Sequence, residues 1–536
     1  MAPSPRPPAT RPAPGARGVP SIGAVRAARL LVLLTILLAA ALGPTQGAAA
    51  LAPRAAEALA PLGRPVHAHV ATKRGPTVGA ALASLLRSGQ IDESVYRKDL
   101  AVYTAAKRSL GRLSGTRRAE LGAVMANVEA MAAAGYVTAS RQAVIFLTLE
   151  RNQLWWTTKP LLSGEVRVSF PPSKIVWEHY PGQGIEIQWL ATFGAGNGFF
   201  LSGHENANLK ALVEEVIPLA TKRAGGIAWE YMFKFDGGSP PWTSGLSQGT
   251  ALQVMARSWQ RFKEPAFLTA AKEALGIFGQ ATPQGVRVPT KAGAEYAEYT
   301  YAPTDRILNG FIQAVVGLYD YTEITKDPLG LKLFEAGDAE AREEVPHYDT
   351  GFWSMYDQYG ESSLNYHELL TEFLQHLCER TRKGPPLLSA TEAPPPTPAT
   401  TPTTPVGAGG GTAPSASAAA AAKPSQIAGD QIYCTTAQRF TADLKTAPAV
   451  SLLSTKVAAH ARAGVKISLS KISTVTMTIR KGSKVVWTNR ATVEGGKPKL
   501  LWVTPAKGGT FSVTLTATDL AGNFSTAQGT LLVSGH

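Results

Sequence analysis

The chain has 536 residues, of which 44% are hydrophobic and 17% are charged. This composition excludes a chain that is disordered throughout, and the length predicts two or more folded units. Lys and Arg exceed Asp and Glu by 53 to 39, which gives a formal net charge of +14. The basic residues are scattered, with no basic run that alternates with aromatic residues. The charge therefore indicates either a polyanionic partner, for which an acidic polysaccharide fits as well as a nucleic acid, or a surface adapted for solubility.

Residues 1–50 have the pattern of a secretory signal. An Arg-bearing, Pro-rich lead precedes the apolar run LLVLLTILLAAAL at Leu30 to Leu42, and small residues follow in GPTQGAAA. The run has roughly a dozen apolar residues, whereas a membrane-spanning helix needs about 20. We therefore expect a signal peptide and a secreted or cell-surface protein, with an uncleaved N-terminal anchor as the alternative.

Residues 75–383 are predicted to form a mainly α domain. Successive amphipathic helices with short connections favour hairpins stacked side by side, whose natural closed form is an (α/α) toroid with a groove for a polymer. A small β insertion interrupts the helices at residues 164–200, where strand-like runs alternate with Pro and Gly. Helical spacing of apolar residues marks 78–89, 95–113, 117–135, 208–224, 247–262, 265–280, 306–325 and 365–381.

The C-terminal part of the chain is predicted to be a linker followed by a β module. Residues 384–428 are rich in Pro, Thr, Gly and Ala and lack the apolar content of a core. Within 429–536, the runs VKISLS, STVTMTIR, SKVVWTN and TFSVTLTATDLAGNFS alternate with period two between Gly-rich turns. This spacing favours an Ig-like β-sandwich, to which we assign no catalysis.

Cysteine occurs twice, at Cys378 and Cys434. Two residues so far apart exclude a disulfide-rich miniature protein and a CxxC-type zinc or redox site. Export would permit a bond between them, which would connect the end of the helical domain to the start of the β module across the linker. Two unpaired thiols are the equal alternative.

Tyrosines cluster where the sequence could carry chemistry, and motifs for serine hydrolysis, zinc proteolysis and nucleotide binding do not occur in a convincing context. At pH 7 a phenol is ready to act as an acid, and it becomes a base only where its surroundings favour phenolate. Two phenols could lie on opposite faces of a carbon that is next to a carboxylate. One would remove the proton of that carbon and the other would return a proton from the opposite face, which inverts the carbon. The tyrosines could instead form a packing cluster or a surface on which sugars stack. His367, considered by itself, fits a structural histidine. The clustered tyrosines are Tyr296, Tyr299, Tyr301, Tyr348, Tyr356, Tyr359 and Tyr366.

Five segments, in order and spacing, resemble the C-terminal domain of the D-glucuronyl C5-epimerases: PPWTSGLSQGTALQVMARSW, YAEYTYAP, LNGFIQAVVGLYDY, HYDTGFWSMYD and NYH. The resemblance is dense from Pro240 to Thr381, weaker over WEHYPGQGIEIQWLATFGAGN, and absent from the linker and the β module. These enzymes convert D-glucuronate to L-iduronate within heparosan-type chains. The resemblance implies abstraction of the uronate C5 proton and its return from the other face, with tyrosines as acid and base and no organic cofactor.

Carried over by motif, the resemblance implies that Tyr299, Tyr356 and Tyr366 are catalytic, with Glu298 tuning Tyr299. We expect Tyr299 and either Tyr356 or Tyr366 to flank C5. The expected substrate-binding residues are Gln248, Arg257, Arg306, Asn309 and His367, and no metal site is expected.

Two positions depart from the family pattern. The family's YDLRH motif reads YDQYG, so Tyr359 stands where an arginine suited to a carboxylate would be, and Leu370 replaces the second histidine of YHxxH. Arg306 or Arg257 would then have to supply the missing charge.

The sequence therefore predicts a secreted, cofactor-independent C5-epimerase whose partner is an acidic polysaccharide containing uronate and not a nucleic acid. Association with the cell envelope is left open. A polysaccharide lyase that uses the same proton abstraction is the alternative enzyme, and a non-catalytic glycan-binding remnant is the alternative outside catalysis.

Overall fold

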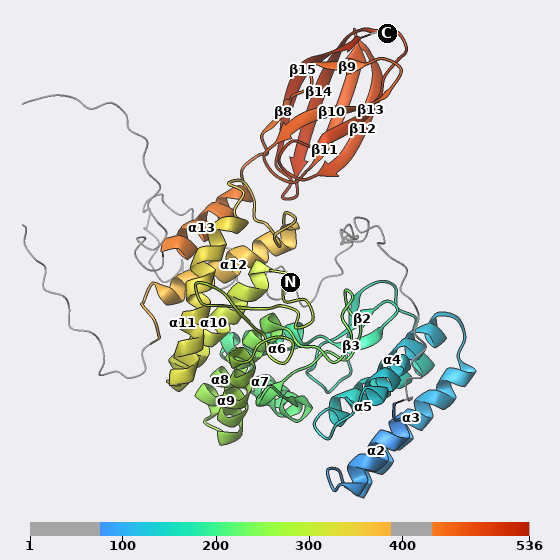
Figure 1. The fold of residues 1–536 in the computed structure, drawn as a ribbon, viewed down its shortest axis with the longest axis vertical. Coiled ribbons are helices and arrows are strands. Elements are labelled where there is room, and N and C mark those ends of the chain that lie inside the picture. The colour runs from blue at the N-terminus through green and yellow to red at the C-terminus, as the bar shows by residue number, and fades with distance from the viewer. Residues whose placement is uncertain (1–74, 387–430, 535–536) are drawn as a thin grey trace, which may run out of the picture. The chain divides into compact units, whose positions relative to one another are not determined.

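The computed structural model describes residues 75–386 and 431–534 (Figure 1). The chain divides into the units Met1–Lys73 and Arg74–His536, and the described residues belong to the second. The predicted signal segment and nearly all of the predicted linker lie outside the described residues. Within the described ranges, no helix is long and apolar enough to cross a membrane.

The first described elements are antiparallel helices, as the sequence predicts. Thr77 begins the first helix because its side chain accepts a hydrogen bond from the Ala80 amide, and Asp92 begins the second by accepting from Val95. A further helix that the sequence analysis did not predict follows them and buries Trp156 completely. These helices are α2 (Val78–Arg87), α3 (Glu93–Arg112), α4 (Gly115–Ala133) and α5 (Gln142–Thr158).

The predicted β insertion is a three-stranded antiparallel sheet of β1 (Val166–Val168), β2 (Trp177–Tyr180) and β3 (Gly184–Ile187). The strand-like interpretation of its last third is wrong, because WLATFGAGNGFF forms the helix α6 (Trp189–Ser202). Its glycines lower helix propensity, but Gly196 lets α6 pack within contact of Leu212 and Val254. Tertiary packing therefore overrides the local signal.

Five of the remaining helices of this region occur in the predicted order, and a sixth, Pro328–Glu344, was not predicted. The helix predicted over 208–224 ends at Val216, because Pro218 lies in a 3₁₀ turn that leads into a short hairpin. The helices are α7 (Asn206–Val216), α8 (Gly245–Phe262), α9 (Pro265–Gly279), α10 (Leu308–Thr325), α11 (Pro328–Glu344) and α12 (Leu364–Thr381). The hairpins between them are β4 (Thr221–Arg223) with β5 (Gly226–Ala228) and β6 (Arg287–Pro289) with β7 (Ala294–Tyr296). Closure of these helices into a toroid stays a prediction.

Glycines bring the backbones of α8 and α10 into contact. A Cβ at Gly317 would overlap the carbonyl of Gly249, and a Cβ at Gly249 would lie 2.6 Å from the Cα of Ala314. Residues larger than glycine at positions 249 and 317 would not permit the two helix backbones to come this close. This contact fixes the middle of α10, the helix that follows the tyrosine-rich segment.

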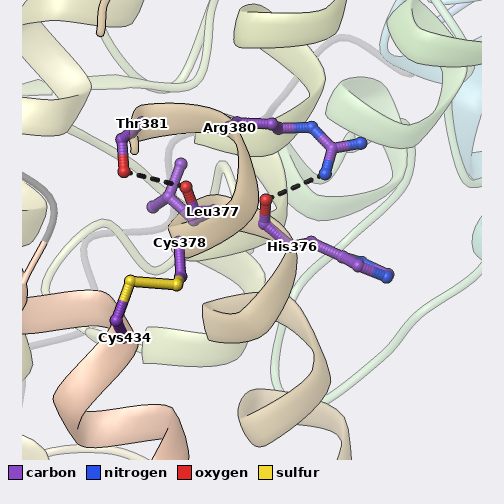
Figure 2. The surroundings of a disulfide bond; sticks show 6 residues. All are labelled: His376, Leu377, Cys378, Arg380, Thr381 and Cys434. Carbon is purple, nitrogen blue, oxygen red and sulfur yellow. Dashed lines mark hydrogen bonds between the residues drawn. A yellow bond between two sulfur atoms is a disulfide. The ribbon is translucent and has the colours of Figure 1, made fainter. Parts of the chain in front are cut away.

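α13 (Gln431–Asp443) is a helix in a part of the chain where the sequence predicts only the β module. It lies alongside α12 (Figure 1), and its buried residues Tyr433, Ala437 and Phe440 belong to the core of the helical region. Figure 2 shows the disulfide that joins Cys378 of α12 to Cys434 of α13, with a Cα–Cα distance of 4.9 Å. The bond spans 56 positions, and closing a loop of that size contributes about 4 kcal/mol.

Two β-sheets that share one core follow α13, as the period-two alternation predicts. Val475, Met477 and Ile479 of one sheet are fully buried, and Trp502 of the other is 1% exposed. One sheet has the order β13-β10-β8 and the other β12-β11-β14-β15-β9. An Ig-like identity stays a prediction. The strands are β8 (Val450–Leu452), β9 (Lys456–Ala458), β10 (Arg462–Leu469), β11 (Ser473–Lys481), β12 (Lys484–Val493), β13 (Lys499–Val503), β14 (Gly509–Asp519) and β15 (Phe524–Ser534).

Substituting Gly317→Ala should lower the free energy of unfolding by about 1–3 kcal/mol, because the methyl group forces α8 and α10 apart. Urea denaturation measures this change. Gly198→Ala is the matched control, since Gly198 is also helical and a Cβ added there would have nothing within 4 Å. It should leave stability unchanged or raise it by up to about 1 kcal/mol. Equal effects of both substitutions would contradict the close helix contact.

Candidate active site

The four side chains that the sequence predicts to be catalytic come from three segments. Glu298 and Tyr299 follow β7 in the segment that leads to α10. Tyr356 lies in the loop between the 3₁₀ turn η2 (Val345–Tyr348) and α12. Tyr366 lies in the first turn of α12, where its amide donates to the side chain of the N-cap residue Ser363.

The structure brings these four side chains together. The Glu298 carboxyl group and the Tyr356 hydroxyl each interact with the Tyr299 side chain. Tyr356 also interacts with Tyr366, and the centroids of their rings are 4.7 Å apart. Glu298 and the three phenols therefore form one interacting group.

Burial dominates the electrostatics of this group. It raises the pKa of Glu298 to about 8, against a hydrogen bond from Tyr299 that lowers it. Burial also raises the pKa of Tyr299, Tyr356 and Tyr366 above that of a free phenol, and the Glu298 carboxylate raises each of them further. At pH 7 the three phenols are thus neutral, and Glu298 is protonated in most molecules.

The other two tyrosines of the segment 294–311 have different surroundings. Tyr296 is fully buried in the core, where its hydroxyl donates to the Leu333 carbonyl at 2.6 Å. The Tyr301 ring stacks on Tyr299 with a centroid distance of 5.4 Å. Trp242 lies against Tyr299 as well, at 5.8 Å. Tyr296 therefore supports the core, while Tyr301 and Trp242 form an aromatic wall around Tyr299.

Polar atoms beside this wall are buried without a hydrogen-bond partner. They are Oε2 of Glu298, the hydroxyl of Tyr301 and both amide atoms of Asn309. Gly310 makes room for the acid, because a Cβ there would overlap the Glu298 carboxylate. The beginning of α10 therefore packs directly against Glu298, and Asn309 lies in this first turn.

Arg306 is committed to three carboxylates, which argues against the expectation that it supplies charge to a substrate. Its guanidinium lies 2.6 Å from Glu295, 2.6 Å from Glu340 and 3.0 Å from Glu344. These contacts tie β7 to α11, and they hold the segment that begins with Glu298.

Arg257 is likewise paired within the protein. It donates to Asp320 at 2.8 Å and to Asn197 at 2.7 Å, and Asp320 also binds Arg380. The group joins α6, α8, α10 and α12. Arg306 cannot turn to a substrate carboxylate without leaving buried acids unpaired, which is strongly unfavourable. Arg257 would have to give up its bonds to Asp320 and Asn197, although Arg380 would still pair with Asp320.

Gln248 and His367, expected to bind substrate, also have their polar atoms bonded inside the protein. The Gln248 amide donates to the carbonyls of Ile227 and Ala274 at 3.0 Å and 3.3 Å. His367 is fully buried and bonds Ser354 and the Phe440 carbonyl. Both residues hold the scaffold of the site and do not line its surface.

The two departures from the family pattern have different structural consequences. Tyr359 is 78% exposed, so it presents an aromatic ring to solvent where the family has an arginine. Leu370 is 1% exposed and fills the core.

Sequence reasoning missed an aromatic group on the other side of the region. Tyr180 at the end of β2 packs against Phe233 with a ring-centroid distance of 4.6 Å, and its hydroxyl accepts a hydrogen bond from Gln188 at 2.7 Å. The Tyr231 hydroxyl donates to the same Gln188 at 3.3 Å, and the Glu298 carboxylate contributes to raising the pKa of Tyr231. The segment WEHYPGQG was the available signal for Tyr180. No group of three or more His, Cys, Asp or Glu side chains in the described ranges is arranged to hold a metal ion.

Replacing Arg306 by Ala should lower the free energy of unfolding by about 3 kcal/mol, because three acids lose their counterion. The effect should be visible in urea denaturation at pH 7. Arg97→Ala is the control, since Arg97 pairs with Glu93 on the exposed face of α3 at 2.7 Å and such pairs contribute about 0.5 kcal/mol or less. An Arg306 variant as stable as the Arg97 variant would refute the structural role.

Residues 224–389 match the family model for the C-terminus of D-glucuronyl C5-epimerase. The match covers a little under a third of the chain and includes Glu298, Tyr299, Tyr356 and Tyr366. α13 and the two C-terminal β-sheets, which are formed by β8 to β15, lie outside the matched region.

Two relatives match parts of this chain. The D-glucuronyl C5-epimerase of Caenorhabditis elegans is 30% identical over 131 residues, which are 22% of this chain and 21% of the worm protein. An uncharacterized protein of Methanocaldococcus jannaschii is 26% identical over 164 residues, which are 29% of this chain and 53% of that protein. The chain thus spans about a fifth of the first relative and about half of the second. The similarity supports an epimerase at the level of the family.

Proposed function

We propose that this chain is a uronate C5-epimerase, which inverts C5 of D-glucuronyl residues to L-iduronyl residues in an acidic polysaccharide. The observation that carries the proposal is the convergence of Glu298, Tyr299, Tyr356 and Tyr366 in one interacting group. The family match supports it, because all four residues lie in the matched region.

The first half of the reaction removes the C5 proton. C5 lies beside the uronate carboxylate, which takes up the electron pair of the broken C–H bond as an enolate. The Tyr299 oxygen accepts the proton while Tyr299 passes its own hydroxyl proton to the Glu298 carboxylate. The pKa of Glu298, about 8, makes this carboxylate a stronger base than an ordinary one.

The second half returns a proton to the other face. Tyr356 donates its hydroxyl proton to C5, and the electron pair of the enolate forms the new C–H bond. Tyr299 and Tyr356 must separate when the sugar enters between them, and they lie on different segments of the chain. After the product leaves, Tyr356 recovers a proton from Glu298 through Tyr299, which interacts with both. Tyr366, whose ring lies 4.7 Å from that of Tyr356, is the alternative acid.

The substrate carboxylate is held by neutral donors in this proposal. Arg306 and Arg257 are tied into ion pairs with acids of the protein itself. The ring of Tyr366 lies beside the ring of Tyr356. The side-chain amide of Asn309 has no hydrogen-bond partner, and the next residue, Gly310, packs against Glu298. Neutral donors bind a carboxylate less strongly than a guanidinium does, so we expect much of the affinity to come from stacking of neighbouring sugars on aromatic rings.

The natural substrate is a polymer outside the cell, on the proposal that residues 1–50 direct export. Exposed aromatic side chains beside the site suit a chain of sugars. Tyr359 is 78% exposed, Phe352 is 47% exposed and Tyr366 is 43% exposed. The β-sheets would then act as a spacer or an attachment to the cell envelope.

Incubation of the full chain with uronate polymers in deuterated water should introduce deuterium at C5 and produce L-iduronate. Tyr299→Phe and Tyr356→Phe should each lower the exchange rate by about 10²–10⁴-fold, because each removes a group that transfers a proton. Nuclear magnetic resonance measures the exchange. Tyr136→Phe, which alters a 44% exposed phenol, is the control and should keep full activity.

Two outcomes of this experiment would reject the proposal. Unsaturated ends that absorb ultraviolet light would identify a lyase, in which the same intermediate expels the C4 substituent. Unchanged glycan binding with no exchange on any uronate polymer would identify a glycan-binding protein.

The exchange rate at low substrate concentration should rise about fivefold between pH 7 and pH 8, as the carboxyl group of Glu298 ionises. The sign follows from the raised pKa of Glu298, because its carboxylate, which acts as the base, becomes the main form only above that pH. Glu298→Gln should remove this dependence together with most of the activity. A rate that stays constant from pH 6.5 to pH 9 would exclude Glu298 as the base.

A further inference from the structure

α13 reaches the candidate site from outside the region that matches the family. The match ends at residue 389, whereas α13 begins at Gln431. Its Phe440 is fully buried, with its ring 5.1 Å from the ring of His367. His367 is the residue next to Tyr366. A helix from the C-terminal part of the chain therefore packs one residue away from a proposed catalytic phenol.

The hydrogen bonds of His367 define its state. The Ser354 amide donates to Nδ1 at 3.2 Å, so Nδ1 carries a lone pair and the imidazole is neutral. Nε2 then carries the hydrogen, which it donates to the Phe440 carbonyl at 3.0 Å. Burial favours the same state, because it lowers the pKa of His367 to about 4. The Trp353 ring stacks on the imidazole at 3.7 Å.

These contacts join three segments at one side chain. Ser354 lies two residues before Tyr356, in the loop that carries that phenol. His367 itself is part of α12, directly after Tyr366. Phe440 belongs to α13. The His367 imidazole thus fixes Tyr356 and Tyr366 relative to each other, and its hydrogen bond to the Phe440 carbonyl connects it to α13.

α13 is anchored to the helical region at both ends. At its beginning, Cys434 is bonded to Cys378, and the buried Tyr433 donates to the Asp338 carboxylate at 2.8 Å. Toward its end, Thr441 accepts a hydrogen bond from Gln375 at 3.2 Å. A helix of 13 residues is marginal in isolation. Its place therefore depends on these contacts and on the disulfide (Figure 2).

We propose that His367 is a positioning residue, which holds Tyr356 and Tyr366 in register by binding both of their segments to α13, and that the Cys378–Cys434 disulfide keeps α13 in place. This inference rests on the proposed epimerase function. It gives the C-terminal helix and the disulfide a role in catalysis, although neither contacts the substrate.

The test compares full-length variants in the deuterium exchange assay over a range of uronate polymer concentrations. His367→Phe keeps a ring on Trp353 but removes the hydrogen bonds to Ser354 and to the Phe440 carbonyl, and it should lower kcat about 10–100-fold with KM within about threefold. His367→Gln retains a donor for the Phe440 carbonyl and should recover at least part of this loss. The Cys378→Ser and Cys434→Ser double variant should lower kcat in the same way. Gln438→Ala, which alters an exposed residue of α13, is the control and should change neither constant.

Hydrogen-exchange mass spectrometry provides a readout that does not depend on substrate. The cysteine double variant should lose amide protection in α13 and around Ser354, while α8 and α10 remain protected. Full protection around Ser354, or unchanged kcat in both the His367→Phe and the cysteine variants, would overturn the inference. If the wild-type protein exchanges no uronate proton but the variant loses protection at Ser354, the proposed epimerase fails while the mechanical connection stands.

Discussion

The candidate site depends on the burial of one carboxyl group among phenols. Burial makes the largest contribution to the raised pKa values of Tyr299, Tyr356 and Tyr366, and the Glu298 carboxylate raises each of them further. A second anion in the group would therefore be strongly unfavourable. The group can pass a proton between its members more easily than it can create new charge. This property suits a reaction that takes a proton from one face of a carbon and returns one to the other.

The buried arginines around this neutral group stabilise the packing of the helices and strands that surround it. Arg306 connects β7 with α11 through three acids, and Arg257 with Arg380 surrounds Asp320 between helices. Charge is thus paired at the positions that fix the backbone, whereas the proposed chemistry takes place among groups that are neutral at pH 7. Loss of the family arginine in YDQYG is consistent with this division, because Tyr359 adds an exposed aromatic surface instead of a charge.

Helical periodicity was sufficient to predict most helices; α2 and α7, for example, bury one face at regular spacing. It failed for α6, in which Gly196 packs against Leu212 and Val254 from other helices. It also failed for α13, which is stable through Phe440, Tyr433 and the disulfide and has no strong local signal. The tyrosine and glutamate motifs identified a group that the structure brings together. The roles of Arg306 and Arg257 could not be predicted, because their partners come from other elements.

The disulfide changes what the segment between α12 and α13 does. Cys378 and Cys434 hold the two flanking helices with Cα atoms 4.9 Å apart, so residues 387–430 begin and end on the same body. A cut in this segment would leave two polypeptides joined through sulfur, and they would separate on a denaturing gel only after reduction. Lengthening the segment would alter loop entropy by only about 0.6 kcal/mol for each doubling. Its length therefore does not set the position of α13 against α12, which the disulfide holds directly.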